Sequence, residues 1–102
     1  MKIDLAGRTA LIIGGTRGTG WEIAKWLHQA GASVIIHGRS REAVTAAATC
    51  LGARTHGVAA DLATPEGIST LIEGVARVSA RIDILVNNDG IPASQPLDIV
   101  PR

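Results

Sequence analysis

The 102-residue sequence contains one cysteine, two tryptophans and neither tyrosine nor phenylalanine. A single cysteine excludes any framework of intramolecular disulfides. That residue, Cys50, lies in an alanine-rich stretch of helical character, and we expect its thiol to be buried and unreactive. Because aromatic side chains are so scarce, the core must be built from Ile, Leu, Val and Ala, a composition typical of buried parallel strands.

Excess charge and long apolar runs are also missing. The formal net charge is +1, which is too close to neutral to indicate a surface for nucleic acid or membrane. The N-terminal residues, 1–5, lack the apolar region of a signal peptide, and no run approaches the roughly 20 residues that span a membrane. We therefore expect a cytoplasmic protein whose length suits one small domain.

The most informative feature that is present is an apolar run, 10–13, that leads directly into a glycine-rich turn. Gly14, Gly18 and Gly20 lie in this turn, and an amphipathic segment follows it. A strand, a glycine turn and a helix in this order present backbone N–H groups and a helix N-terminus to a phosphate group. The alternative is a strand-to-helix turn that binds no ligand. Three glycines at fixed offsets from the end of the strand favour nucleotide binding.

Segments of strand and helix character alternate along the chain. We expect four strands, at 9–14, 33–37, 55–60 and 82–87. We expect three helices, at 19–30, 41–51 and 65–79, the last two capped by Ser40 and Thr64. This alternation implies right-handed crossovers and an α/β fold, a partial doubly wound (Rossmann-type) parallel sheet with strand order 3-2-1-4. Helices one and two would cover one face and helix three the other. Residues 1–91 form this domain, and 92–102 an irregular tail.

The spacing of the glycines separates the known kinds of phosphate-binding loop. Gly15 and Gly20 have the glycine spacing of a P-loop, but Trp21 stands where that loop requires lysine, so a P-loop is excluded. Residues 14–20 follow the pattern Gly-x-x-x-Gly-x-Gly. This pattern resembles the Thr-Gly-x-x-x-Gly-x-Gly motif of the short-chain dehydrogenase/reductase family, with Ile13 in the position of the threonine.

The end of the second expected strand indicates which dinucleotide the site prefers. An NAD site places an acidic residue there to bind the ribose 2′-hydroxyl. Here the segment 37–41 reads His-Gly-Arg-Ser-Arg, without an acid. A guanidinium suits the 2′-phosphate of NADP (NADPH), and Arg17 and Ser40 could contact the same phosphate. The alternative is that Arg39 and Arg41 only line a solvated helix start, although a cation there is electrostatically unfavourable without a bound anion.

Two further segments resemble motifs of the same family. Asp61-Leu62, after the third strand, is similar to its Asp-Val/Leu pair, in which the aspartate hydrogen-bonds the adenine. Residues 87–90, Asn-Asn-Asp-Gly, are similar to its Asn-Asn-Ala-Gly strand end. By this resemblance Asn87 helps to hold the central sheet, and the residues after it run past the cofactor ribose. Asp89 replaces the alanine, and its carboxylate should weaken binding unless it faces solvent or pairs with a cation.

These motifs together define the predicted cofactor site. The predicted cofactor-binding residues are Gly14, Thr16, Arg17, Gly18, Thr19, Gly20, Arg39, Ser40, Asp61, Leu62, Asn88 and Gly90. His37 is expected to be a strand-end histidine satisfied by its neighbours. We assign no metal ligand and no catalytic residue.

The catalytic groups of the family are not found in the sequence. Its members use a serine and a Tyr-x-x-x-Lys pair, in which the tyrosine transfers the proton as hydride moves to or from the nicotinamide. This sequence contains no tyrosine. The resemblance therefore implies the NADP(H)-binding portion of such an enzyme, inactive as an isolated chain. The alternatives are a catalytically silent nucleotide-binding module or remnant, and an interaction fragment that binds no nucleotide. With a sheet edge and an apolar face left open, we expect marginal stability, self-association or a completing chain.

Overall fold

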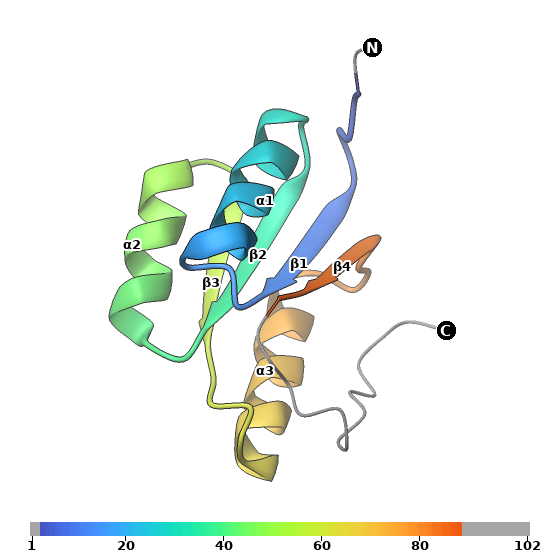
Figure 1. Cartoon of the computed structure of the whole chain (residues 1–102). Coiled ribbons are helices and arrows are strands. Elements are labelled where there is room, and N and C mark those ends of the chain that lie inside the picture. Colours follow the sequence, from blue (N-terminus) through green and yellow to red (C-terminus); the bar gives the residue numbers. More distant parts are fainter. Residues whose placement is uncertain (1–2, 89–102) are drawn as a thin grey trace.

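The computed structural model describes residues 3–88, which form a four-stranded parallel sheet with three helices (Figure 1). The strands are β1 (Thr9–Ile13), β2 (Ser33–Gly38), β3 (Thr55–Ala59) and β4 (Ile84–Asn87), and the helices are α1 (Gly18–Gln29), α2 (Arg41–Leu51) and α3 (Pro65–Val78). The strand order is β3-β2-β1-β4, as predicted. The one shift of more than a residue is at β4, which begins at Ile84 rather than at 82. The predicted tail, 92–102, lies outside the described residues.

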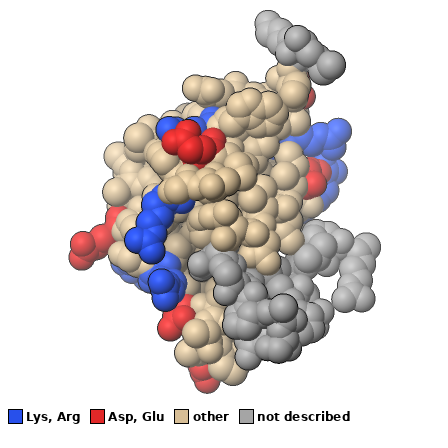
Figure 2. All heavy atoms as spheres, viewed as in Figure 1, with Lys and Arg blue, Asp and Glu red and all other residues tan. Residues whose placement is uncertain are grey.

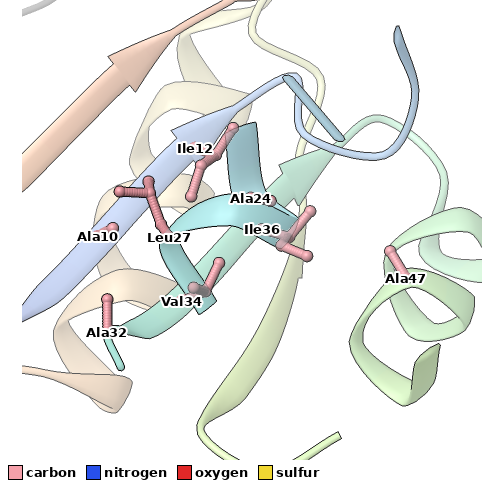
Figure 3. Packing of buried hydrophobic residues seen from close by; sticks show 8 residues of the cluster. All are labelled: Ala10, Ile12, Ala24, Leu27, Ala32, Val34, Ile36 and Ala47. Carbon is pink, nitrogen blue, oxygen red and sulfur yellow. The ribbon is translucent and has the colours of Figure 1, made fainter. Parts of the chain in front are cut away.

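Aliphatic side chains from both faces of the sheet form two core layers, as the scarcity of aromatics requires. The layer beneath α1 and α2 contains Ala10, Ile12, Ala24, Leu27, Ala32, Val34, Ile36 and Ala47 (Figure 3). The layer beneath α3 contains Leu11, Ile13, Ile35, Val58, Ala60, Leu62 and Leu71. Successive residues of β1 alternate between the two layers, so the central strand is buried on both faces. This arrangement confirms that two helices cover one face and one covers the other.

Side-chain caps fix where the second and third helices begin. The Ser40 hydroxyl oxygen accepts a hydrogen bond from the Ala43 N–H, 3.2 Å away, at the start of α2. The Thr64 hydroxyl oxygen accepts one from the Gly67 N–H, 2.9 Å away, at the start of α3. Both caps satisfy N–H groups that the first helical turn leaves without a backbone partner. The two predicted caps are thus confirmed.

The expectation for Cys50 was wrong, because its side chain is exposed. The buried positions of α2 are Val44 and Ala47, and Leu51 continues the same stripe at half burial. Positions 44, 47 and 51 repeat at helical spacing, and Cys50 falls about 100° away from the last of them. An alanine-rich composition could not reveal this phase.

No helix within residues 3–88 is both long enough and apolar enough to cross a membrane.

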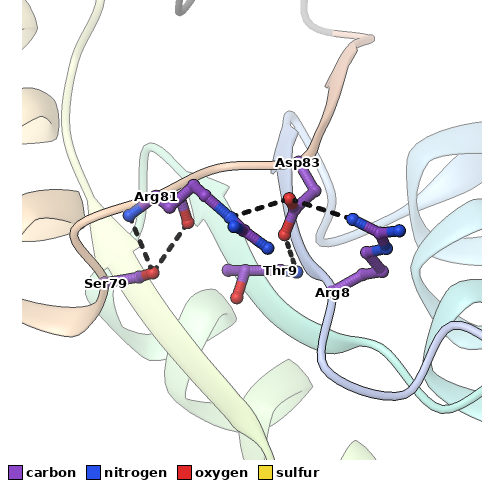
Figure 4. A network of polar contacts seen from close by, with 5 residues as sticks. All are labelled: Arg8, Thr9, Ser79, Arg81 and Asp83. Carbon is purple, nitrogen blue, oxygen red and sulfur yellow. Dashed lines mark hydrogen bonds and ion pairs between the residues drawn. The ribbon is translucent and has the colours of Figure 1, made fainter.

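A polar network at the N-terminal end of β1 holds β4 in register beside it (Figure 4). The carboxylate of Asp83 accepts a hydrogen bond from the Thr9 N–H at 2.9 Å, while the Asp83 N–H donates to the Thr9 carbonyl at 2.8 Å. The same carboxylate lies 3.0 Å from Arg81 Nε and 3.7 Å from Arg8 Nη1. The register that follows pairs Ile13 with Asn87, at the opposite end of the two strands.

We predict that Asp83→Asn lowers the thermal unfolding midpoint at pH 7. The Thr9 N–H, followed by the charges of Arg81 and Arg8, holds the pKa of Asp83 below its ordinary value of 3.8, although desolvation opposes this. A lowered folded-state pKa means that the carboxylate stabilises the fold above pH 3.8 and that this contribution is lost as pH falls through the folded-state pKa. Thermal melts from pH 7 down to pH 2 should therefore show the wild-type advantage shrinking in acid.

The matched control is Glu73→Gln on α3, since Glu73 is exposed and forms no ion pair within the described residues. Its midpoint at pH 7 should change less than that of the Asp83 variant. A difference between wild type and Asp83→Asn that stays constant across the acid range would contradict the assigned role of the carboxylate.

Candidate functional site

Within residues 3–88, no side chain caps the first N–H groups of α1, which follow the turn after β1. Gly14 and Gly18 adopt positive φ angles of 76° and 62°, which favour glycine. Arg17 is the N-cap of α1, but its side chain makes no capping hydrogen bond, and the first turn contains no acidic residue. The other two helices have both a side-chain cap and an acidic residue in the first turn. An uncapped helix N-terminus with a partial positive charge is suited to bind an anion.

Gly20 lets α1 approach the end of β1 closely. A Cβ atom at this position would overlap the carbonyl oxygen of Gly14 and lie 2.9 Å from Nδ2 of Asn88. That Asn88 amide donates a hydrogen bond to the same Gly14 carbonyl at 3.2 Å, and the Asn88 N–H donates to the Ile13 carbonyl at 2.9 Å. The third glycine of the motif therefore permits the close helix–strand packing that its position in the pattern predicts.

His37 joins the glycine turn to the ends of the next two strands. Its side chain is completely buried, with the ring atom Nδ1 3.1 Å from the Gly14 nitrogen and Nε2 2.8 Å from the Ala60 carbonyl oxygen. The His37 carbonyl also accepts a hydrogen bond from the Gly15 N–H at 2.9 Å. These contacts confirm a histidine satisfied by its neighbours.

An open pocket of about 600 Å³ lies beside the glycine turn. Its lining residues are Gly14, Thr16, Arg17, Gly18, Arg39, Ser40, Ala43 and Asn88. They come from three separate segments, namely the β1–α1 turn, the start of α2 and the residue after β4. All of them except Ala43 are predicted cofactor-binding residues. Ala43 is the third residue after the Ser40 cap, and that spacing alone could have placed it in the first turn facing the site.

The pocket is electropositive. Arg17 and Arg39 are both exposed, neither forms an ion pair within residues 3–88, and none of the described lining residues carries a carboxylate. Figure 2 shows Lys and Arg side chains on the same side of the molecule as the starts of α1 and α2. Arg41 instead lines a second pocket of about 310 Å³ between β3 and α3. The two neighbouring arginines of the sequence motif therefore face different sites.

The remaining predicted site residues are placed differently. Thr19 and Gly20 lie in the first turn of α1 but do not line the pocket. The Asp61 carboxylate is exposed and accepts a hydrogen bond from the Ala63 N–H at 3.0 Å, whereas Leu62 is buried beneath α3. Their cofactor contacts stay predictions, and Asp89 and Gly90 lie outside the described residues. No cluster of three potential metal ligands occurs in the described part of the chain.

We predict that Gly20→Ala displaces the glycine turn. The added Cβ would meet backbone atoms rather than a flexible side chain, so α1 or the turn must move. The expected loss in unfolding free energy is about 1–3 kcal/mol, measured by urea denaturation. Amide resonances of residues 14–16 and 88 should shift in a heteronuclear NMR spectrum. The control is Gly52→Ala, which introduces a side chain at a positive φ of 85° but has open space around it at the far end of α2. Unchanged resonances near residue 14 in Gly20→Ala would refute the contact.

Comparison with known proteins agrees with this geometry. The model of the short chain dehydrogenase family matches residues 8–100. The chain is 43% identical over 100 residues to a rhamnolipid-biosynthesis 3-oxoacyl-(acyl-carrier-protein) reductase of Pseudomonas aeruginosa, covering 96% of this chain and 39% of that protein. It is 42% identical over 95 residues to the 3-oxoacyl-(acyl-carrier-protein) reductase of Aquifex aeolicus, covering 89% and 38% respectively.

Solved structures give the same result. The NADP complex of Pseudomonas aeruginosa RhlG superimposes with a TM-score of 0.81 at 44% identity, covering 88% of this chain and 37% of that one. An L-sorbose reductase of Gluconobacter frateurii, in complex with NADPH and L-sorbose, has a TM-score of 0.81 at 32% identity, with 99% and 40% covered. The chain thus spans about two fifths of the length of its relatives. Because the family model matches nearly the whole length of this chain, the chain belongs to the short-chain dehydrogenase family.

Proposed function

We propose that this chain binds NADP(H) in the pocket beside the glycine turn, as the cofactor-binding portion of an enzyme that transfers hydride between a nicotinamide and a carbonyl or alcohol. The observation that carries the proposal is that Arg39 and Ser40 line the same pocket as Gly14 and Gly18. A guanidinium and a phosphate-binding turn on one cavity match the two phosphate-bearing parts of NADP.

The residues around Arg39 favour a phosphate over a free ribose hydroxyl. Recognition of a 2′-hydroxyl uses a carboxylate after the second strand, but β2 is followed by Arg39 and Ser40. The Ser40 oxygen accepts from the Ala43 N–H, which leaves its own hydrogen available to donate to a phosphate oxygen. Arg17 belongs to the glycine turn after β1, far from Ser40 in the sequence, but it lines the same pocket. Two cations and a hydroxyl therefore favour NADP over NAD.

The fit of the turn supports a pyrophosphate beside it. No side chain in the described part of the chain caps the first N–H groups of α1, and helix N-termini of this kind bind phosphates in dinucleotide folds. Both Pseudomonas RhlG and the Gluconobacter reductase are similar to this chain and were solved with NADP or NADPH. We extend the proposal to Asp61 and Leu62 at the adenine and to Gly90 at the ribose on the family resemblance alone.

Hydride transfer itself needs groups beyond this sequence. The 102 residues include no tyrosine, so the proton-transfer residue that the family uses must be supplied from outside them. We propose that the chain acts only when completed by further residues, in a longer product or in a second chain. In support, the outer edge of β4 pairs with no strand among residues 3–88, and Ile84, Leu85 and Val86 are only half-buried. A silent nucleotide-binding module is the second candidate, and the cytoplasmic location stays a prediction.

We predict that Arg39→Ala weakens NADP⁺ binding by roughly tenfold or more, the loss expected for one charge-assisted contact. NAD⁺ binding should change little, because NAD⁺ carries no 2′-phosphate. Isothermal titration calorimetry of the 102-residue chain with both dinucleotides measures the difference.

Arg41→Ala is the matched control, since Arg41 is two residues away and also exposed but lines the other pocket. NADP⁺ affinity in this variant should stay within about twofold, because only long-range charge is removed. Equal losses in the two variants would refute a specific role for Arg39. If the wild type binds neither dinucleotide, the proposed function itself is wrong.

A further inference from the structure

His37 is the one buried polar or charged residue in the part of the chain that the structure describes. It lies near the end of β2, one residue before Gly38 and two before Arg39 of the pocket. A buried polar side chain lowers stability unless its hydrogen bonds are made. Both ring nitrogens have partners, and no buried side-chain nitrogen or oxygen in the described residues is left unpaired.

The partners of the two nitrogens determine the form of the ring. The Gly14 N–H can only donate, so Nδ1 must be the unprotonated acceptor. The Ala60 carbonyl can only accept, so Nε2 must carry the hydrogen. The imidazole is therefore the neutral Nε2–H form, and each nitrogen has the partner that this form requires.

The two contacts join segments that form different walls of the nucleotide site. On one side, Gly14 belongs to the phosphate-binding turn, and the His37 carbonyl also holds the next amide, Gly15. On the other side, Ala60 immediately precedes the Asp61-Leu62 pair, and its N–H donates to the Gly38 carbonyl at 3.0 Å. One residue thus connects the ends of β1, β2 and β3.

We infer that His37 is a positioning residue of the nucleotide site, which fixes the glycine turn relative to the ends of β2 and β3. This inference rests on the proposed NADP(H) binding. The side chain is fully buried and does not line the pocket, so it acts through Gly14 rather than by touching a ligand. An apolar side chain of similar size would fill the space, but the Gly14 N–H would lose its acceptor. The peptide group of Gly14 could then change its orientation.

The test separates the two ring nitrogens. In His37→Asn the amide oxygen can occupy the place of Nδ1 and keep the acceptor for Gly14. In His37→Gln the amide nitrogen can occupy the place of Nε2 and keep the donor to Ala60. His37→Leu keeps neither. Val34→Ala is the control, since it truncates a fully buried side chain at the opposite end of the same strand.

Two measurements are made on the 102-residue chain, at a temperature where each variant is folded. The first is hydrogen exchange of the Gly14 amide by NMR, and the second is NADP⁺ affinity by calorimetry. We expect His37→Leu and His37→Gln to speed Gly14 exchange and weaken NADP⁺ binding, each by roughly tenfold or more. His37→Asn should retain most of the protection and affinity. Val34→Ala should lower the melting temperature while leaving both within about twofold.

Other outcomes would overturn the inference. NADP⁺ affinity within twofold of wild type in folded His37→Leu would show that the turn is positioned without His37. Equal behaviour of the Asn and Gln variants would show that burial alone matters. Should the Leu variant not fold, the Asn and Gln pair carries the test. A wild type that binds no NADP⁺ refutes the proposed function, but Gly14 exchange still decides whether His37 holds the turn.

Discussion

The close approach of Gly20 to Gly14 is the constraint on which the rest of the site depends. Only a residue without a side chain fits between the first turn of α1 and the carbonyl of Gly14. This contact directs the N-terminus of α1 across the end of the central strand. The Gly14 carbonyl then accepts from Asn88 after β4, and its N–H donates to His37 of β2. Both polar groups of one glycine are thus held by side chains, one from β2 and one from the residue that follows β4.

The parallel sheet brings the segments that line the pocket together around this contact. Because the carboxyl ends of parallel strands meet at one edge of the sheet, the turn after β1, the start of α2 and the residue after β4 come together there. Asp83 secures the opposite end of β4, where its backbone and carboxylate both bond to Thr9. Register at one end therefore places Asn88 against the glycine turn at the other. Among residues 3–88, the aliphatic core beneath contains no buried polar side chain except that of His37.

Periodicity and caps predicted the elements and their order, since alternating apolar segments allow few arrangements in a parallel sheet. They could not predict contacts that depend on helix phase. Cys50 was expected to be buried because its neighbours are alanines, yet the buried stripe passes through Ala47 and Leu51 instead. Arg39 and Arg41 look equivalent in sequence but flank a helix start. Arg39 precedes the extended Ser40 cap, whereas Arg41 is the first residue of α2, so the chain turns between them and the two arginines line separate pockets.

Nucleotide binding and folding should be coupled in this chain. All described residues that line the pocket come from 14–43 and 88, so the proposed NADP(H) contacts need no catalytic residue. The half-buried strand β4 supplies Asn88 to this pocket and carries the less protected side of the sheet. A ligand that binds only the folded state adds about 2.7 kcal/mol of stability at a concentration a hundredfold above its dissociation constant. The glycine turn, which would contact the ligand, is also hydrogen-bonded to Asn88. The stabilisation by the ligand would therefore extend to β4, the half-buried edge strand of the sheet.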